Sequence, residues 1–302
     1  MSQRRFYALG TASQVPTRER NHNGYFLRWD DEGFLFDPGE GTQRQMIFSD
    51  VSASSITKIF ITHFHGDHCL GLSGILQRLS LDKVTHKVQL FFPASGQKFI
   101  NSLRTSSIYH NVAIIEEIPI SNEGVIFDSE NFYIESRKLS HTVESWGYRI
   151  QEKDSFTMLP EKLVEFNVFR KDIGVLKKTG SVIIDGKTIK VEDCGVFKKG
   201  QSVAFIMDTR ICDNIFQLTQ DVDLLVCEST YLKPETQDAI AHGHLTATHA
   251  AEIAQKSNAD LLALTHFSQR YLNTKDFVSE AKLIHEHTIA FRDGDFVDLP
   301  KR

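Results

Sequence analysis

The sequence predicts a layered α/β fold for this chain of 302 residues. Segments with the apolar spacing of β-strands alternate with segments in which apolar residues recur at helical spacing. Three apolar strands in the second half each end on a polar residue, and active-site side chains of α/β sheets gather at such strand ends. We therefore expect a single domain over residues 1–302 with one inserted arm.

The first half of the chain carries the clearest alternation. Residues 24–29 and 33–37 flank the turn sequence Asp30-Asp31-Glu32-Gly33, which predicts a hairpin. Residues 56–62 are apolar and β-branched, which is typical of a buried strand. Further strands are expected at residues 5–9 and 88–92, helices at 42–49 and 70–81, and a strand-rich stretch at 131–149.

The same pattern resumes in the last third of the chain. We expect strands at residues 202–207, 224–227 and 261–265, and a helix at 246–256. The three strands are followed directly by Asp208, Glu228 and His266. The sequence thus predicts that these polar side chains lie at one edge of a sheet.

The composition is typical of a globular protein of the cytoplasm. No apolar run reaches the length of about 18 residues that a transmembrane helix needs, and residues 1–9 lack the apolar core of a secretory signal. The cysteines at 69, 194, 212 and 227 are scattered and form no CxxC pair, so we interpret them as reduced thiols. The net charge of −5 argues against a non-specific nucleic-acid coat but allows a site-specific nuclease.

Residues 152–200 differ in composition from their surroundings. They contain Lys or Arg at ten positions and Asp or Glu at eight, with the doublets Arg170-Lys171, Lys177-Lys178 and Lys198-Lys199. We interpret this segment as an inserted arm outside the core. The alternative is an ordinary solvated loop region with two helices, because charge runs usually mark solvated surface.

The strongest functional signal is the run His63-Phe64-His65-Gly66-Asp67-His68. Side chains two apart on an extended segment point the same way, so His63 and His65 can reach one cation. Gly66 permits a tight turn that directs Asp67 and His68 toward a second cation. A lone histidine is usually a satisfied polar residue, but four ligand-type side chains within six positions favour a metal site.

Two cations need more ligands than this run supplies. His141, Asp208 and His266 are three candidates at expected strand ends. Each alone could be an ordinary strand-end residue, but together they complete seven ligands, which suits two ions that share a bridging carboxylate. Mixed imidazole and carboxylate ligands favour zinc, with manganese and iron as alternatives.

The run from His63 to His68 resembles the signature of the metallo-β-lactamase superfamily. Nearly the whole chain resembles one family of that superfamily, the ribonuclease Z family of tRNA 3′-processing endonucleases, in its bacterial short form. Pro16 to Asn21 is similar to the family's PxKxRN loop, with Arg18 in place of Lys. The other segments that carry the resemblance are Leu9 to Thr11, Phe36 to Gln45, Cys227 to Tyr231, Gly243 to Ala247 and Leu264 to Tyr271.

The resemblance implies a fold, a metal site and a set of roles. The fold is an αββα sandwich with an exosite-like arm. One zinc ion is held by His63, His65 and His141, the other by Asp67, His68 and His266, and Asp208 bridges them. Three residues take part in catalysis: Asp67 orients or deprotonates the attacking water, and His244, supported by Glu228, protonates the leaving oxygen. The residues expected to contact substrate are Arg18, Arg20 and Asn21.

Two departures from the family pattern affect these expectations. The family usually has Ser after the histidine of its HST motif, where this chain has Leu245. The family's arm contains a Gly-Pro-rich segment, and residues 167–174 stand there instead, which affects the details of RNA binding. The resemblance still implies that residues 152–200 are an exosite for the tRNA elbow, and that the protein is a homodimer.

The implied reaction is removal of the 3′ trailer from precursor tRNA by two-metal phosphodiester hydrolysis. It leaves a 3′-OH on the tRNA and a 5′-phosphate on the trailer. A broad-specificity phosphodiesterase of the same superfamily is the alternative. A non-catalytic RNA-binding member is disfavoured, because such a protein is expected to lack metal ligands and all seven are present here.

Overall fold

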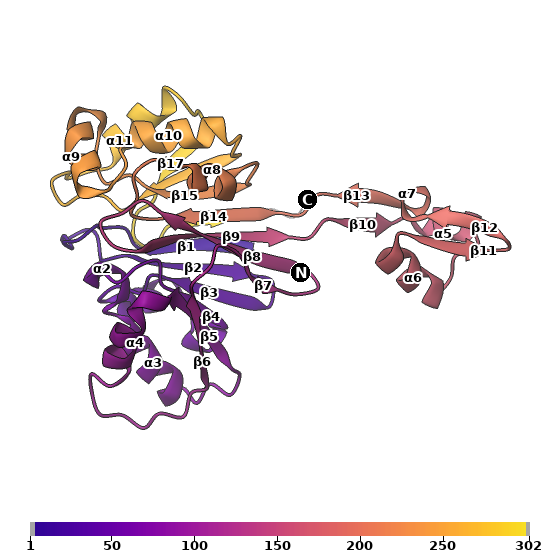
Figure 1. Cartoon of the computed structure of the whole chain (residues 1–302), viewed down its shortest axis with the longest axis horizontal. Coiled ribbons are helices and arrows are strands. Elements are labelled where there is room, and N and C mark those ends of the chain that lie inside the picture. Colours follow the sequence, from indigo (N-terminus) through magenta and orange to yellow (C-terminus); the bar gives the residue numbers. More distant parts are fainter. Residues whose placement is uncertain (1–3, 300–302) are drawn as a thin grey trace.

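Two seven-stranded sheets face each other at the centre of the molecule (Figure 1). The computed structural model describes residues 4–299, so the outermost residues of the predicted domain, 1–3 and 300–302, lie outside the described part of the chain. The first sheet has the order β18-β1-β2-β3-β4-β5-β6. Its strands are β1 (Arg4–Gly10), β2 (Gly24–Trp29), β3 (Glu32–Phe36), β4 (Lys58–Phe60), β5 (Val88–Pro93), β6 (Ile115–Ile120) and β18 (Phe296–Asp298).

The second sheet supplies the strand ends on which the site depends. It has the order β17-β16-β15-β14-β9-β8-β7, and β14, β15 and β16 run parallel, so their carboxyl ends meet at one edge. Its strands are β7 (Gly124–Asp128), β8 (Phe132–Leu139), β9 (Ser145–Glu152), β14 (Ser202–Ile206), β15 (Leu224–Glu228), β16 (Leu261–Thr265) and β17 (Thr288–Ala290).

Helices cover the outer face of each sheet, which gives four layers (Figure 1). The helices beside the first sheet are α1 (Thr42–Phe48), α2 (Gly66–Cys69), α3 (Leu72–Leu81) and α4 (Gln97–Arg104). Those beside the second sheet are α8 (Asp213–Thr219), α9 (Thr236–His242), α10 (Ala247–Lys256) and α11 (Lys275–Lys282). Short 3₁₀ turns lie at Ala53–Ser55, Ala94–Gly96 and Lys233–Glu235.

Aromatic side chains fill the space between the two sheets. Phe205 of the second sheet is fully buried, and its ring centroid lies 4.7 Å from that of Phe36 and 5.1 Å from that of Tyr25 in the first. Phe60 stacks on Phe36 with ring centroids 4.9 Å apart. This core buries large apolar surface on both inner faces and holds the metal-binding edges of the two sheets against each other.

Residues between β9 and β14 form an arm that projects from one end of the sandwich (Figure 1). The arm folds around a small apolar cluster of its own, which includes Val168, Leu176 and Cys194. Its elements are β10 (Ser155–Met158), α5 (Pro160–Glu165), α6 (Lys171–Thr179), β11 (Ser181–Ile184), β12 (Lys187–Lys190), α7 (Val191–Cys194) and β13 (Gly195–Lys198). The antiparallel pair β10 and β13 is the stem that joins the arm to the body.

The predicted alternation of strands and helices is confirmed, with changes in length. The strand expected at 56–62 is only β4, because the chain after Phe60 leaves the sheet to form the site. The helix expected at 70–81 is α3, preceded by the separate short α2. None of the helices within residues 4–299 combines the length and the apolar character that a membrane crossing requires. All four cysteines are free thiols.

Candidate metal centre and active site

The seven predicted ligands converge from both sheets on one buried point. His63 and His65 follow β4, and Asp67 and His68 lie in α2. His141 lies in the turn after β8, whereas Asp208 and His266 follow β14 and β16. His266 has φ +61°, a backbone conformation that non-glycine residues rarely adopt, at the point where the chain turns out of β16.

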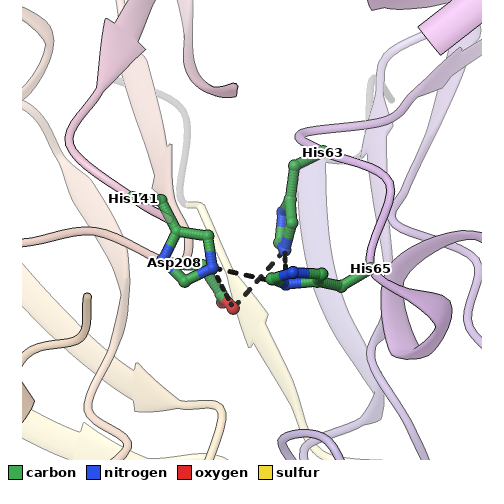
Figure 2. A group of neighbouring side chains, drawn as sticks. All are labelled: His63, His65, His141 and Asp208. Carbon is green, nitrogen blue, oxygen red and sulfur yellow. Dashed lines mark hydrogen bonds and ion pairs between the residues drawn. The ribbon is translucent and has the colours of Figure 1, made fainter. Parts of the chain in front are cut away.

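Three histidines surround one carboxylate oxygen of Asp208 (Figure 2). Oδ2 of Asp208 lies 3.5 Å from Nε2 of His63 and 3.7 Å from Nε2 of His141. Nδ1 of His65 lies 3.1 Å from Nε2 of His63 and 3.3 Å from Nε2 of His141. Figure 2 shows the four side chains pointing toward one another.

The other oxygen of Asp208 faces a second group. Its Oδ1 lies 3.1 Å from Nε2 of His266 and 3.4 Å from Nε2 of His68. Oδ2 of Asp67 lies 3.3 Å from Nε2 of His68 and 3.6 Å from Nε2 of His266. Asp208 therefore stands between two sets of ligand atoms, with one oxygen directed to each.

The spacing of these atoms fits bound cations. Ligand atoms held tetrahedrally at about 2.0–2.1 Å from a zinc ion lie roughly 3.3 Å from one another, close to the separations seen here. Oδ1 of Asp208 and Nε2 of His266 are also buried, and within residues 4–299 neither has a hydrogen-bond partner. Buried polar atoms are costly unless satisfied, so their arrangement matches a site built for metal ions.

The far nitrogen of four of the histidines is held by a hydrogen-bond partner. Nδ1 of His68 lies 2.8 Å from Oδ2 of Asp37, and Nδ1 of His141 donates to the carbonyl of Gly243 at 2.8 Å. Nδ1 of His266 and of His63 contact the hydroxyls of Thr230 at 2.7 Å and of Thr62 at 3.0 Å. These contacts orient each ring and leave Nε2 free to bind a cation.

At His63 and Asp208 the electrostatics favour the protonation states that metal ligands need. At His68 burial lowers the pKa, but the neighbouring carboxylates, Asp67 first, outweigh it and raise the pKa well above its usual range. Burial, and then the neighbouring His68, lower the pKa of His63 well below its usual range, which keeps its ring neutral. Burial raises the pKa of Asp208, but the surrounding histidines, His266 first, outweigh this and hold the pKa well below its usual range. Asp208 is thus ionised and able to bridge cations.

His244 and Glu228 form a pair beside the metal cluster. Nδ1 of His244 lies 3.0 Å from Oε1 of Glu228, which is fully buried. Oε1 of Glu228 also accepts from the Thr209 amide, and Oε2 accepts from the Thr230 hydroxyl at 2.6 Å. Burial lowers the pKa of His244, but Glu228 and Asp208 outweigh it and raise the pKa to about 9. His244 therefore carries a proton that it can deliver through Nε2.

A cavity of about 410 Å³ opens over these groups, and its lining includes Asp67, Asp208, His244 and His266. Residues 13–15, directly before the PxKxRN-type loop, line its wall. Of the three loop residues expected to contact substrate, only Arg18 is exposed. Arg20 is buried and donates to the carbonyls of Ser268 and Tyr271, whereas the Asn21 side chain donates to the carbonyls of His22 and Glu40. Arg20 and Asn21 thus hold the loop in place.

Comparisons with known proteins identify the family. Over its whole length the chain is 45% identical to ribonuclease Z of Streptomyces coelicolor, which is also covered in full. It is 44% identical to ribonuclease Z of Chlamydia abortus, with 100% of this chain and 98% of the relative covered. The chain belongs to the ribonuclease Z family.

Structure and family model agree with this assignment. The crystal structure of human tRNase Z, short form, matches with a TM-score of 0.72 and 26% identity over 98% of this chain and 99% of that one. A model of the metallo-beta-lactamase superfamily matches residues 17–145. The fold expected of a ribonuclease Z, an αββα sandwich, is confirmed. The superfamily and the histidine and aspartate clusters indicate that this family member uses divalent metal ions.

Sequence reasoning missed several residues that hold the ligands of this ribonuclease Z family member. Asp37 and Thr230 contact the far nitrogens of His68 and His266, and Gly243 accepts from His141. Asp37 stands at the end of a predicted strand and within the Phe36 to Gln45 segment that resembles the family, but neither feature assigned it a role. Arg210 donates to the carbonyls of Ile240 and Ala241, which fixes the chain just before His244, and it had no signal of its own.

Replacing Gly243 with alanine is expected to lower metal affinity and cleavage together, by about 10–100-fold. Gly243 has φ +81°, and a Cβ there would lie 2.7 Å from Nδ1 of His141. The His141 ring would have to move and lose its hydrogen bond to the Gly243 carbonyl. Titration with Zn²⁺ and a cleavage assay measure both effects. Gly180→Ala is the matched control, because Gly180 has φ +78° with nothing within 4 Å; equal losses in both variants would contradict the prediction.

Proposed function

We propose that this protein is the endoribonuclease that removes the 3′ trailer from precursor tRNA. The observation that carries the proposal is the arrangement of six ligand-type side chains around a seventh, Asp208, beside the His244–Glu228 pair, in a chain 45% identical to a ribonuclease Z over its full length. The four free thiols are consistent with a place in the cytoplasm.

The residues divide the hydrolysis between them. Divalent cations held by the seven ligands would supply Lewis acidity, which would polarise the phosphate and make water nucleophilic at neutral pH. Asp67 lines the cavity, and its carboxylate orients the attacking water or accepts its proton. His244 donates the proton on Nε2 to the departing ribose 3′ oxygen, while Glu228 holds its Nδ1 proton and balances its charge. The tRNA keeps a 3′-OH and the trailer keeps the phosphate at its 5′ end.

A cleavage assay tests the proposal. Purified protein is incubated with a precursor tRNA labelled at its 5′ end, and the cut is mapped to the nucleotide. We expect one cut directly after the discriminator nucleotide and a 3′-OH on the tRNA. Hydrolysis of a small phosphodiester without any cut in precursor tRNA would instead point to a broad-specificity phosphodiesterase.

We propose zinc as the metal, with two ions in each subunit. Six of the seven ligands are divided evenly between two clusters, five of the seven are histidines, and nitrogen-rich tetrahedral sites favour zinc over magnesium or calcium. Metal analysis of protein purified without added metal checks the identity. If the analysis finds two manganese or iron ions per chain, the identity of the metal is wrong but the proposed two-ion site stands.

The arm is proposed to be an exosite that binds the tRNA elbow. Lys177 and Lys178 lie in the last turn of α6 and are exposed. The double substitution Lys177→Glu and Lys178→Glu is expected to raise KM for precursor tRNA about tenfold, because each lost phosphate contact removes counterion release. The rate on bis(p-nitrophenyl) phosphate should not change. Equal effects on both substrates would contradict an exosite.

The homodimer is part of the same proposal. Leu81 at the end of α3 is 76% exposed, and Ile108 in the loop after α4 is fully exposed. Leu81 lines the same surface hollow as Tyr109, the neighbour of Ile108 in the chain, and contiguous exposed apolar patches are typical of protein contacts. Light scattering at micromolar concentration should give twice the mass of the chain, and Ile108→Asp should shift it toward the monomer. A monomeric wild-type protein would contradict this part.

A further inference from the structure

A buried arginine ties the arm to the sandwich. Arg4 of β1 is 6% exposed and makes five hydrogen bonds to side chains. Its Nη1 and Nη2 donate to the two carboxylate oxygens of Glu152, at 2.7 and 2.9 Å. The remaining bonds run to Oδ2 of Asp30 at 2.7 and 3.1 Å and to Oε1 of Gln201 at 3.0 Å. The guanidinium also lies over the Trp29 ring, 4.1 Å from its centroid.

Two of these partners stand where the chain enters and leaves the arm. Glu152 is the last residue of β9, and Gln201 directly precedes β14 (Figure 1). The two are paired with each other, because each backbone amide donates to the other residue: Glu152 to the carbonyl of Gln201 at 2.8 Å, and Gln201 to Oε2 of Glu152 at 2.9 Å. Arg4 thus holds both connections of the arm at once.

The residues around this junction leave it little freedom. The amide of Gly200 donates to Oδ1 of Asp154 at 2.8 Å, and a Cβ at Gly200 would lie 1.9 Å from the carbonyl oxygen of Glu152. Burial raises the pKa of Glu152, but the hydrogen bonds from Arg4 outweigh this and hold the pKa below its usual range. A planar guanidinium bound at both ends of a carboxylate fixes direction as well as distance.

The arm has few other means of keeping its direction. Its apolar cluster contains arm residues, such as Val168 and Leu176, and is separate from the clusters of the sandwich. A segment that packs on itself and joins the body through two strands can swing at its base unless the base is held. The direction of the arm therefore depends on the contacts at its stem. The Arg4 network is charged and buried, and Nζ of Lys198 in β13 adds a second contact to Oε1 of Glu152 at 3.6 Å.

We propose that Arg4 is a positioning residue for precursor tRNA, which fixes through Glu152 the angle at which the arm leaves the sandwich. The inference rests on the proposed function of the arm as a tRNA exosite. If the arm is already set at the correct angle, binding does not have to order it, and affinity is higher for that reason. Arg4 does not touch the reacting atoms and acts only through the arm.

The first test compares two neutralising substitutions on the same arginine. Glu152→Gln weakens the contact from Arg4 at the base of the arm, together with the contact from Lys198, whereas Asp30→Asn weakens a contact of Arg4 within the body. We expect Glu152→Gln to raise KM for precursor tRNA about five- to tenfold, because the freed arm must be ordered during binding. Asp30→Asn should change this KM less than about twofold, and both variants should hydrolyse bis(p-nitrophenyl) phosphate at the wild-type rate. Equal KM changes in the two variants would overturn the proposal.

Hydrogen exchange supplies a readout independent of activity. In Glu152→Gln, amides of the stem strands Ser155–Met158 and Gly195–Lys198 should exchange faster, whereas those of β14 should keep their wild-type rates. Arg4→Lys should give an intermediate increase in exchange, because lysine keeps the positive charge but lacks the planar guanidinium that binds both carboxylate oxygens. Arg5→Met is the control, since Arg5 pairs with Asp298 on the surface. Unchanged exchange in the stem of Glu152→Gln would refute the inference.

The outcomes separate this inference from the proposed function. Failure of the wild-type protein to cut precursor tRNA would contradict the proposed function itself. If the wild-type protein cuts precursor tRNA normally but the Lys177→Glu and Lys178→Glu substitutions leave KM unchanged, the exosite proposal is contradicted. A KM that rises in those arm variants but not in Glu152→Gln would leave the exosite intact and overturn the role of Arg4.

Discussion

Replacing Asp208 with alanine is expected to lower kcat for precursor tRNA by about 10⁴-fold or more, since metal ions supply several kcal/mol of transition-state stabilisation. The two oxygens of Asp208 face two different sets of ligand atoms, so a single substitution removes a ligand from both. The remaining histidines would be left with their mutual repulsion and without the carboxylate that offsets it. We therefore expect less than one cation per chain in the purified variant, measured by elemental analysis.

Asp208→Asn refines this test. The amide keeps the size of the side chain but loses the negative charge, so the variant should still fold and should still bind metal poorly. Asp276→Ala replaces an exposed aspartate of α11 and serves as the control for loss of one carboxylate. Circular dichroism should give wild-type spectra for all three variants. Metal content and cleavage near wild-type values in Asp208→Ala would show that the bridging carboxylate is not needed.

Replacing His244 with glutamine is expected to lower kcat for precursor tRNA by about 10²–10⁴-fold, the range typical of a lost general acid. His244 lies in the cavity wall, and its Nδ1 is held by Glu228. We expect metal content to stay unchanged, because all seven predicted ligands, Asp208 among them, are untouched. His287→Gln, at an exposed histidine far along the chain, is the control.

The choice of substrate tests the role of His244 more sharply. A ribose 3′ oxygen leaves poorly without a proton, whereas p-nitrophenolate leaves readily without one. The loss caused by His244→Gln should therefore be large on precursor tRNA and small on bis(p-nitrophenyl) phosphate. Losses of the same size on both substrates would assign His244 to binding or to structure instead of proton donation.

Much of the sandwich could be predicted because its central strands have a clear apolar pattern. Residues 24–29 and 224–227 are mostly apolar and almost entirely buried on both faces, and both form strands as expected. Edge strands have no such pattern: in β18 the residues Phe296 to Asp298 are partly or largely exposed, and the strand forms only because β1 offers an open edge. Because β1 and β18 are separated by nearly 300 residues of chain, no local sequence pattern predicts that they pair.

The site, like the fold, could be predicted from the sequence only in part. The run from His63 to His68 predicted metal binding from local spacing alone, because its ligands lie on one turn. His141, Asp208 and His266 were singled out only by their places after strands, and the family resemblance then implied their roles. The contact from His141 to the carbonyl of Gly243 joins residues 102 positions apart. Because it uses a backbone atom of Gly243, no side-chain type in the sequence predicts it.

Anomalous diffraction from crystals soaked in Zn²⁺ tests the central claim most directly. The account predicts two peaks per chain, one between His63, His65 and His141 and the other between Asp67, His68 and His266, with Asp208 in contact with both. A single peak, or peaks that lack Asp208 or His266 as ligands, would contradict it.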